Sequence, residues 1–403
     1  MKTFRQYIQE STDKNRHLEH LEDLIFDQGV DGAKSACEFL VGLTDMLSGS
    51  SKSPINLMVK WDGSPSIVCG TNPENGKFFV ATKSAFNKTP KINYSNEDID
   101  ANHQSSVSEV LKICLSNLSQ LNIGGVLQGD LLYLKQDLKI AEHRGQKLIT
   151  FRRNTITYAV PQESRMGKDI LASNLGIVFH TTYTGDTIQS LKASYGADIS
   201  SLKSSRVWAT DAFFNDTSGV STMTKNETVY ATKRVSQIKL LVSKMDISLV
   251  NAIISNTSLK SSIKQYINSK VKDGQNIEGT KSYANGLVNF ISNRYVTEID
   301  RLKTDKGKNN KQQSMANTLA FIQENSEQFV LLFMIAALIS DVKGLLISKL
   351  QKVESVGTFL QTSNGFRVTA PEGFVAVDHI GNVIKLVDRL EFSRANFTMD
   401  RSW

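Results

Sequence analysis

The feature that most constrains the fold is an apolar run, Ile55 to Val59, that ends in Lys60-Trp61-Asp62-Gly63. A short apolar run followed by turn residues predicts a buried β-strand, and Asp-Gly is a strong turn signal. The sequence therefore places a lysine amine at the end of a strand and immediately before a turn. Taken alone, the tetrapeptide also fits a solvent-exposed hairpin turn.

Four further segments continue the β pattern along the chain. Residues 126–133 form an apolar run with one acidic residue, Asp130, and residues 176–183 form an apolar and aromatic run around Phe179. Near the C-terminus, residues 372–378 begin with Glu372-Gly373, and residues 383–389 contain Lys385. Taken alone, each of these polar residues is also explained as part of a turn, as a cap or as a surface side chain. The evidence for a function therefore lies in the order of the motifs along the chain.

In this order the motifs resemble those of the covalent nucleotidyltransferase superfamily, which contains DNA ligases, RNA ligases and capping enzymes. The resemblance covers roughly residues 50–235 and 356–395. It implies an α+β fold in which a ligase-type nucleotidyltransferase domain, mainly antiparallel sheets with flanking helices, carries an inserted all-helical domain. It also implies attack of a lysine amine on the α-phosphate of ATP to form a lysyl-AMP, with GTP and NAD open as alternative donors.

The resemblance assigns roles to the first group of motif residues. Lys60 is the expected nucleophile, a role that suits lysine because its pKa falls readily beside other cations. Asp62 and Gly63 are expected to shape the turn, and Ser64 to lie close to the nucleotide. Lys83, in Ala-Thr-Lys-Ser, stands where the family has a basic residue near the ribose and phosphates.

The later motifs are expected to complete the site. The resemblance places Asp130 at the ribose or the metal, Glu372 at a divalent metal (Mg²⁺ or Mn²⁺) and Lys385 at the α-phosphate. Phe179 is expected to stack on the base, and Tyr158 is the alternative. The chain departs from the family at two positions: Asp130 replaces a glutamate, and the usual second lysine of the last strand is absent, where this chain has Leu386-Val387.

The domain organisation follows from a change of pattern near residue 236. Apolar residues recur at helical spacing over 15–47 and again over 236–355, whereas β signals dominate elsewhere. We therefore expect a nucleotidyltransferase domain over 11–235, a helical insertion over 236–355 and the last strands over 356–403. The charged stretch Asp305 to Gln313 is expected to be a loop between helices.

The charge and the end of the chain favour a polynucleotide substrate. A net charge of +7 favours an anionic partner, of which nucleic acid is the usual one. Only 18 residues follow Lys385, which leaves no room for the oligonucleotide-fold domain that DNA ligases and capping enzymes carry there. An RNA-ligase-like enzyme, acting on RNA rather than DNA, is therefore expected. Its helical insertion would offer lysines to phosphates, unless these simply form a solvated face: Lys260, Lys264, Lys270 and Lys272.

The first ten residues suggest a source and a location. Met1 to Glu10 is a short amphipathic segment that ends in Ile-x-Glu. It resembles the capsid-targeting leader of internal proteins in large T-even-type tailed phages, which a prohead protease cleaves, here after Glu10. An ordinary first helical turn is the alternative. We expect the cytoplasm of the bacterial host, or the inside of the virion, as the location.

The composition bears on whether the chain is a disulfide-bonded, zinc-binding or membrane protein. Three cysteines without a paired short spacing argue against a disulfide framework and a zinc site. The longest apolar run, Phe329 to Ile339, is too short to span a bilayer, so it predicts a buried core helix and no membrane partner. Two alternatives stay open: transfer of the nucleotide to a protein or small molecule, and a non-catalytic internal virion protein that binds nucleic acid.

Overall fold

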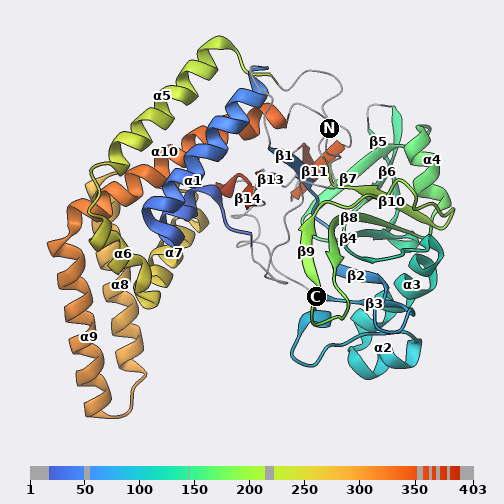
Figure 1. Cartoon of the computed structure of the whole chain (residues 1–403), viewed down its shortest axis with the longest axis horizontal. Helices are drawn as coiled ribbons and strands as arrows, with labels where there is room; N and C mark the ends of the chain where they lie inside the picture. The colour runs from blue at the N-terminus through green and yellow to red at the C-terminus, as the bar shows by residue number, and fades with distance from the viewer. Residues whose placement is uncertain are drawn as a thin grey trace. The chain divides into compact units, whose positions relative to one another are not determined.

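The structure is a computed structural model that describes residues 18–49, 55–143, 145–213, 222–351, 357–362, 365–368, 373–378 and 382–390. The chain divides into two compact units (Figure 1). The sheet unit comprises Met1–Leu18, Asn56–Ser218 and Val353–Val383, and the helical unit comprises Glu19–Ile55, Gly219–Lys352 and Ile384–Trp403. The expected α+β class, with antiparallel sheets and many helices, is confirmed.

The larger sheet of the sheet unit has the strand order β10-β8-β4-β2-β3, with β9 paired to β8. All neighbouring pairs are antiparallel except β10 and β8, which are parallel. Asp130 is the one residue of β4 that is not buried, so it interrupts an otherwise apolar central strand. The strands are β2 (Ser66–Thr71), β3 (Phe78–Ala81), β4 (Val126–Leu134), β8 (Leu175–Thr184), β9 (Lys192–Tyr195) and β10 (Val207–Asp211).

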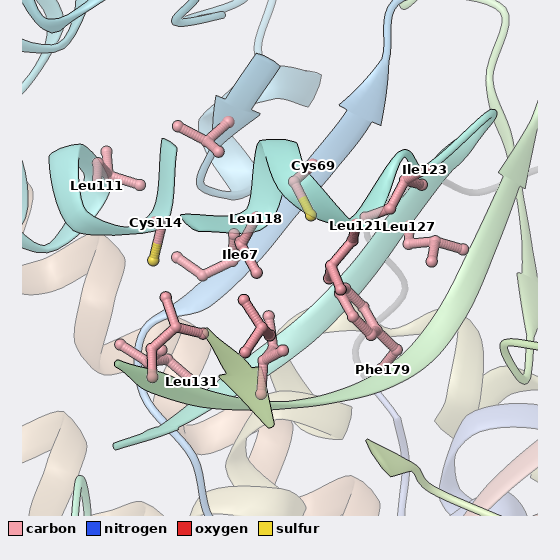
Figure 2. Packing of buried hydrophobic residues seen from close by; sticks show 14 of the residues in the cluster. Ile67, Cys69, Leu111, Cys114, Leu118, Leu121, Ile123, Leu127, Leu131 and Phe179 are labelled. Atoms are coloured by element: carbon pink, nitrogen blue, oxygen red, sulfur yellow. The ribbon is translucent and has the colours of Figure 1, made fainter. Parts of the chain in front are cut away.

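One face of this sheet packs against helix α3 (Ser105–Leu118), as Figure 2 shows. The helix contributes Leu111, Cys114 and Leu118 to a buried apolar core, and the sheet contributes side chains such as Leu131 and Phe179. Since side chains alternate along a strand, the polar residues between these core positions belong to the opposite face of the sheet. That opposite face carries the candidate site.

Two further sets of strands complete the sheet unit. A five-stranded sheet has the order β12-β11-β7-β6-β5, and β1 (Asn56–Lys60) pairs antiparallel with β13 (Gly373–Val377). Segments from both ends of the chain therefore build this unit. Its remaining elements are β5 (Lys139–His143), β6 (Gln146–Phe151), β7 (Ile156–Pro161), β11 (Gly357–Thr362), β12 (Gly365–Val368), α2 (Asn96–Asn102) and α4 (Arg165–Ala172).

The helical unit is built around α10 (Ser326–Leu350), whose buried residues include Phe333, Ile339 and Leu346. The predicted core helix over 329–339 is confirmed. By length and composition α10 is also apolar enough to cross a membrane, although half of its apolar stretch is buried. The absence of a membrane partner stays a prediction. The other helices are α1 (Leu24–Leu47), α5 (Lys225–Val242), α6 (Ile247–Ser255), α7 (Thr257–Lys272), α8 (Lys281–Asp300) and α9 (Asp305–Glu324).

Buried charges tie distant segments of the helical unit together. The Nζ of Lys343 on α10 donates to both carboxylate oxygens of Glu22 at 2.7 Å and to the carbonyl of Val387 at 3.0 Å. Arg389 pairs with the same Glu22 carboxylate at 2.9 Å and also with Asp23. Burial alone would raise the pKa of Glu22, but Lys343 and Arg389 outweigh it and hold that pKa below its usual range.

The structure differs from the sequence expectations at two places. Helix α1 contacts α5 and α10, so residues 19–55 belong to the helical unit. The second chain segment of this unit begins at Gly219, whereas the sequence pattern predicted 236. The stretch Asp305 to Gln313 is not a loop, because it forms the first half of α9. The Thr304 side chain caps that helix by accepting a hydrogen bond from the Gly307 amide, and the helix packs against α8.

Candidate functional site

Lys60 is the last residue of β1, and its side chain is half-buried. Across the strand pair it stands opposite Gly373, the first residue of β13. Gly373 has a φ of +148°, a backbone conformation that glycine adopts most readily. The Lys-x-Asp-Gly and Glu-Gly motifs, which are far apart in the sequence, therefore meet at one strand pair.

Asp62 anchors the loop that follows Lys60. Its buried carboxylate accepts hydrogen bonds of 2.6 Å from the backbone amides of Thr155 and Ile156 and from the Asn154 side chain. Its own backbone amide donates to the Tyr158 hydroxyl at 2.7 Å. Three donors occupy the two oxygens, so the side chain fixes the loop to the start of β7, and a direct contact with a nucleotide stays a prediction.

At Gly63 and Ser64 the same loop packs closely against β4. A Cβ at Gly63 would lie 2.7 Å from the Leu131 carbonyl oxygen and 2.8 Å from the Asp130 Cβ, so only glycine fits. The Ser64 amide donates to the Leu131 carbonyl at 2.8 Å, and the Leu131 amide donates to the Pro65 carbonyl at 3.1 Å. The Asp-Gly sequence is thus required by a close approach to the strand that carries Asp130.

Asp130 lies beside His180 and within electrostatic reach of Lys60. The nearest oxygen of its carboxylate is 3.6 Å from the His180 Nε2, and about a quarter of the Asp130 side chain is exposed (24%). Burial would raise the pKa of Asp130, but His180, Lys60 and a hydrogen bond from Ser66 outweigh burial and hold that pKa below its usual range. The site therefore keeps an ionised carboxylate on which the charge of Lys60 acts.

Sequence reasoning missed the polar network on this face of the sheet. Gln128 donates to the Ser66 hydroxyl at 2.9 Å and accepts from the Tyr183 hydroxyl at 2.6 Å. Ser66 stands opposite Asp130 in the β2–β4 pair. The available signal was the two-residue spacing of Gln128 and Asp130, which places both side chains on one face of a strand.

His180 faces the site next to a bulge in β8. Thr181 pairs with Gln128 and Phe179 pairs with Gly129, which leaves His180 as the extra residue between them. The His180 Nδ1 is 2.8 Å from the Thr181 hydroxyl, which orients the ring. Because His180 directly follows the core residue Phe179, the alternation of side chains already sets it on the face opposite the core. This signal was present in the sequence, although His180 was not among the predicted site residues.

The two aromatic residues expected at the base belong to the interior. The Phe179 side chain is fully buried in the core under α3, on the face opposite Asp130, so we correct its predicted stacking role to a packing role (Figure 2). Tyr158 is buried as well, with its hydroxyl bound to the Asp62 amide and its ring 5.0 Å from the Trp61 ring. Neither ring is available to a base in this structure.

The remaining predicted residues are distributed around or beyond this cluster. Lys83 is exposed and begins a short 3-10 helix (Lys83–Phe86) two residues after the end of β3. Glu372 lies outside the described residues, although the adjacent Gly373 is opposite Lys60. Lys385 lies in β14 (Val383–Leu386) and within the helical unit, so its contact with a phosphate stays a prediction.

Comparison with known proteins places the chain in a family. Residues 15–401 match the Family of unknown function (DUF6267). The chain belongs to this family. No curated protein and no solved structure matches the chain. For this member of DUF6267, the geometry around Lys60 is what bears on function.

The carboxylates of the site suit magnesium or manganese. Asp130 is ionised, partly exposed and oxygen-bearing, which fits a hard divalent cation. Among the residues that the structure describes, no three histidines, cysteines or acids gather into a ready-made metal cluster. In proteins, Mg²⁺ is usually held by one or two carboxylates and the substrate phosphates, and it keeps several waters. Asp130, with Glu372 as the second expected ligand, would hold it.

Proposed function

We propose that this protein is an ATP-dependent polynucleotide ligase of the covalent nucleotidyltransferase type, with Lys60 as the nucleophile and RNA ends as the substrate. The observation that carries the proposal is the strand-end lysine beside an ionised carboxylate, Asp130, with Gly63 packed between their two segments. A ligase-type nucleotidyltransferase fold is part of the proposal, and the antiparallel sheets of the sheet unit support it.

The first step forms a covalent enzyme intermediate. The neutral Nζ of Lys60 attacks the α-phosphorus of ATP, a nitrogen–phosphorus bond forms, and the bond to the β-phosphate oxygen breaks. Pyrophosphate leaves, and the amine loses one proton to solvent. A bound Mg²⁺ would supply positive charge that stabilises the pentacoordinate transition state and the departing pyrophosphate.

The next two steps transfer AMP and seal the ends. An oxygen of a polynucleotide 5′-phosphate attacks the lysyl-AMP phosphorus, the nitrogen–phosphorus bond breaks, and the nitrogen takes up one proton from solvent, which releases the Lys60 amine and forms an adenylylated 5′-end. A 3′-hydroxyl then attacks the 5′-phosphorus, forms the phosphodiester bond, loses its proton and expels AMP. All three steps exchange one phosphorus–heteroatom bond for another, so no oxidant or reductant is needed.

Residues of the chain have separate duties in this scheme. The Asp62 anchor and the Gly63 approach fix where the loop after Lys60 lies against β4. Asp130 provides a negative charge that would hold the cation, and Lys83 lies at the end of the same sheet, where it would meet phosphate oxygens. Preorganised charge of this kind stabilises a transition state without reorganisation during the reaction.

Covalent labelling tests the proposal directly. The purified protein is incubated with α-³²P-ATP and Mg²⁺, and the denatured chain is analysed for retained label. Lys60→Arg keeps the positive charge but removes the nucleophilic amine, and Lys77→Ala, on the exposed β2–β3 hairpin, is the matched control. We expect label in the unaltered chain and in Lys77→Ala, and none in Lys60→Arg.

The outcomes separate the competing functions. Label that is retained in Lys60→Arg would refute the assignment of the nucleophile. Label that requires Lys60 but passes to no RNA or DNA 5′-phosphate would favour transfer to a protein or a small molecule. A complete lack of label with ATP, GTP and NAD would leave a non-catalytic protein that binds nucleic acid.

A further inference from the structure

The helical unit contains two sets of lysines with different surroundings, and two lysines of the first set are paired with carboxylates. On α7, Lys264 donates to Asp27 at 2.8 Å and to Glu19 at 3.1 Å, and Lys260 lies 3.8 Å from the same Asp27. Lys270 lies over the Tyr266 ring at 5.6 Å, and Lys272 is exposed. Of the four predicted phosphate-binding lysines of α7, Lys260 and Lys264 are therefore engaged within the protein.

The second set lies on α5 and the turn that follows it. Lys225, Lys233 and Lys244 are exposed, and no ion pair involves them in the described part of the chain. We call these three residues the α5 lysine face. Lys239 is also exposed, but it lies close enough to α1 for its charge to lower the pKa of the Cys37 thiol. We therefore leave Lys239 out of the α5 lysine face.

The acidic residue of α5 does not compensate this face. Glu227 pairs with the buried Lys349 of α10 and with the Thr224 backbone amide, which lower its pKa to about 2. Its charge is thus directed toward the interior of the helical unit. The α5 lysine face therefore keeps its positive charge, whereas Lys260 and Lys264 of α7 are paired with acidic residues.

The shape and composition of the face fit a polynucleotide strand. Helix α5 has 18 residues and so runs roughly 27 Å, long enough to follow several phosphates of an extended strand. Val229 and Leu240 are 59% and 58% exposed between the lysines and can contact sugars and bases. Lys233 and Ser236 separate these two apolar residues, so the helix lacks the continuous apolar stripe that inserts into a lipid surface.

We propose that the α5 lysine face binds the phosphodiester backbone of a single polynucleotide strand. The inference rests on the proposed function, because it supplies the surface that would hold the strand whose end is sealed. Charge complementarity identifies the partner: three exposed lysines along α5 and the turn that follows it match the regularly spaced phosphates of a flexible strand.

The test measures binding as a function of salt. Fluorescence anisotropy follows a 30-nucleotide single-stranded RNA, and a DNA of the same sequence, titrated with the full chain from 50 to 400 mM KCl without nucleotide. Lys→Gln at all three positions, Lys225, Lys233 and Lys244, should reduce the steepness of log K against log salt by about 2, at about 0.7 per lost contact. In 0.1 M salt this corresponds to a loss of affinity on the order of 100-fold.

A matched variant separates the α5 lysine face from net charge. Lys→Gln at Lys281, Lys303 and Lys306 removes three exposed lysines from the same unit but none from α5, so its salt dependence should equal that of the unaltered chain. Equal losses in both triple variants would overturn the proposal, as would no binding of RNA or DNA by the unaltered chain. Circular dichroism melts of each variant establish that the unit is folded.

The outcome is independent of the reaction at Lys60. Binding is measured without ATP, so it can succeed when covalent labelling fails, and then the α5 lysine face belongs to a binding protein. Labelling can also succeed when the α5 variant binds RNA normally, and then the strand is held elsewhere. The two proposals therefore stand or fall separately.

Discussion

Replacing Asp62 tests whether this residue acts as an anchor for the loop or as a ligand for the nucleotide. In Asp62→Ala, the buried backbone amides of Thr155 and Ile156 lose the Asp62 carboxylate as an acceptor. Each unsatisfied buried amide costs about 1–3 kcal/mol, so the sheet unit should lose about 4 kcal/mol of unfolding free energy. Asp62→Asn should cost only about 1 kcal/mol, because its amide oxygen can still accept both backbone bonds while the Asn154 amide turns over.

Urea unfolding followed by tryptophan fluorescence measures the effect, since Trp61 and Trp208 both lie in the sheet unit. Asp186→Ala, an exposed carboxylate on the same unit, is the matched control and should unfold like the unaltered chain. Labelling of Lys60 should fall in proportion to the fraction unfolded. A fully stable Asp62→Ala that cannot be labelled would refute the anchor and make Asp62 a nucleotide ligand.

Further substitutions test the neighbouring packing and the helical unit. Gly63→Ala should abolish labelling and cost about 1–3 kcal/mol, because the added methyl meets Asp130; labelling at the normal rate would contradict this. Phe179→Leu should cost about 1–2 kcal/mol by denaturant titration yet retain ATP affinity, because the ring is in the core; a selective loss of ATP binding would restore the stacking role. Lys343→Met should destabilise the helical unit by about 3–5 kcal/mol, measured by hydrogen exchange, because Glu22 loses a buried partner. Since the pKa of Glu22 is lowered on folding, its contribution should be complete above about pH 4.5, its value in the unfolded chain, and should disappear as the pH falls below that in thermal melts.

Local sequence patterns were sufficient to predict the strands that carry the site. The strand ending at Lys60, the apolar strand interrupted by Asp130 and the strand around Phe179 were all placed within one or two residues. These predictions rest on short-range rules, because burial of a strand requires consecutive apolar residues and a turn requires residues such as Asp-Gly. The core helix around Phe333 followed in the same way.

The sequence did not determine the partners of charged residues. Lys264 on α7 was expected to be available to phosphates, but it is bound by Asp27 and Glu19. Lys225 and Lys233 of α5, which no motif singled out, are exposed. Identical side chains on similar helices differ here only through which distant segment packs beside them, and no local pattern records that.

By itself, the sequence determined that a lysine ends a strand, that a carboxylate interrupts the central strand of a sheet, and that a helical region follows. Only the tertiary structure decided that Asp62 binds the start of β7, that His180 lies beside Asp130, and that Phe179 packs in the core. The physical reason is the range of the interactions. Backbone propensity and side-chain alternation act over a few residues, whereas hydrogen-bond partners, strand register and burial depend on chain segments that meet only in the fold.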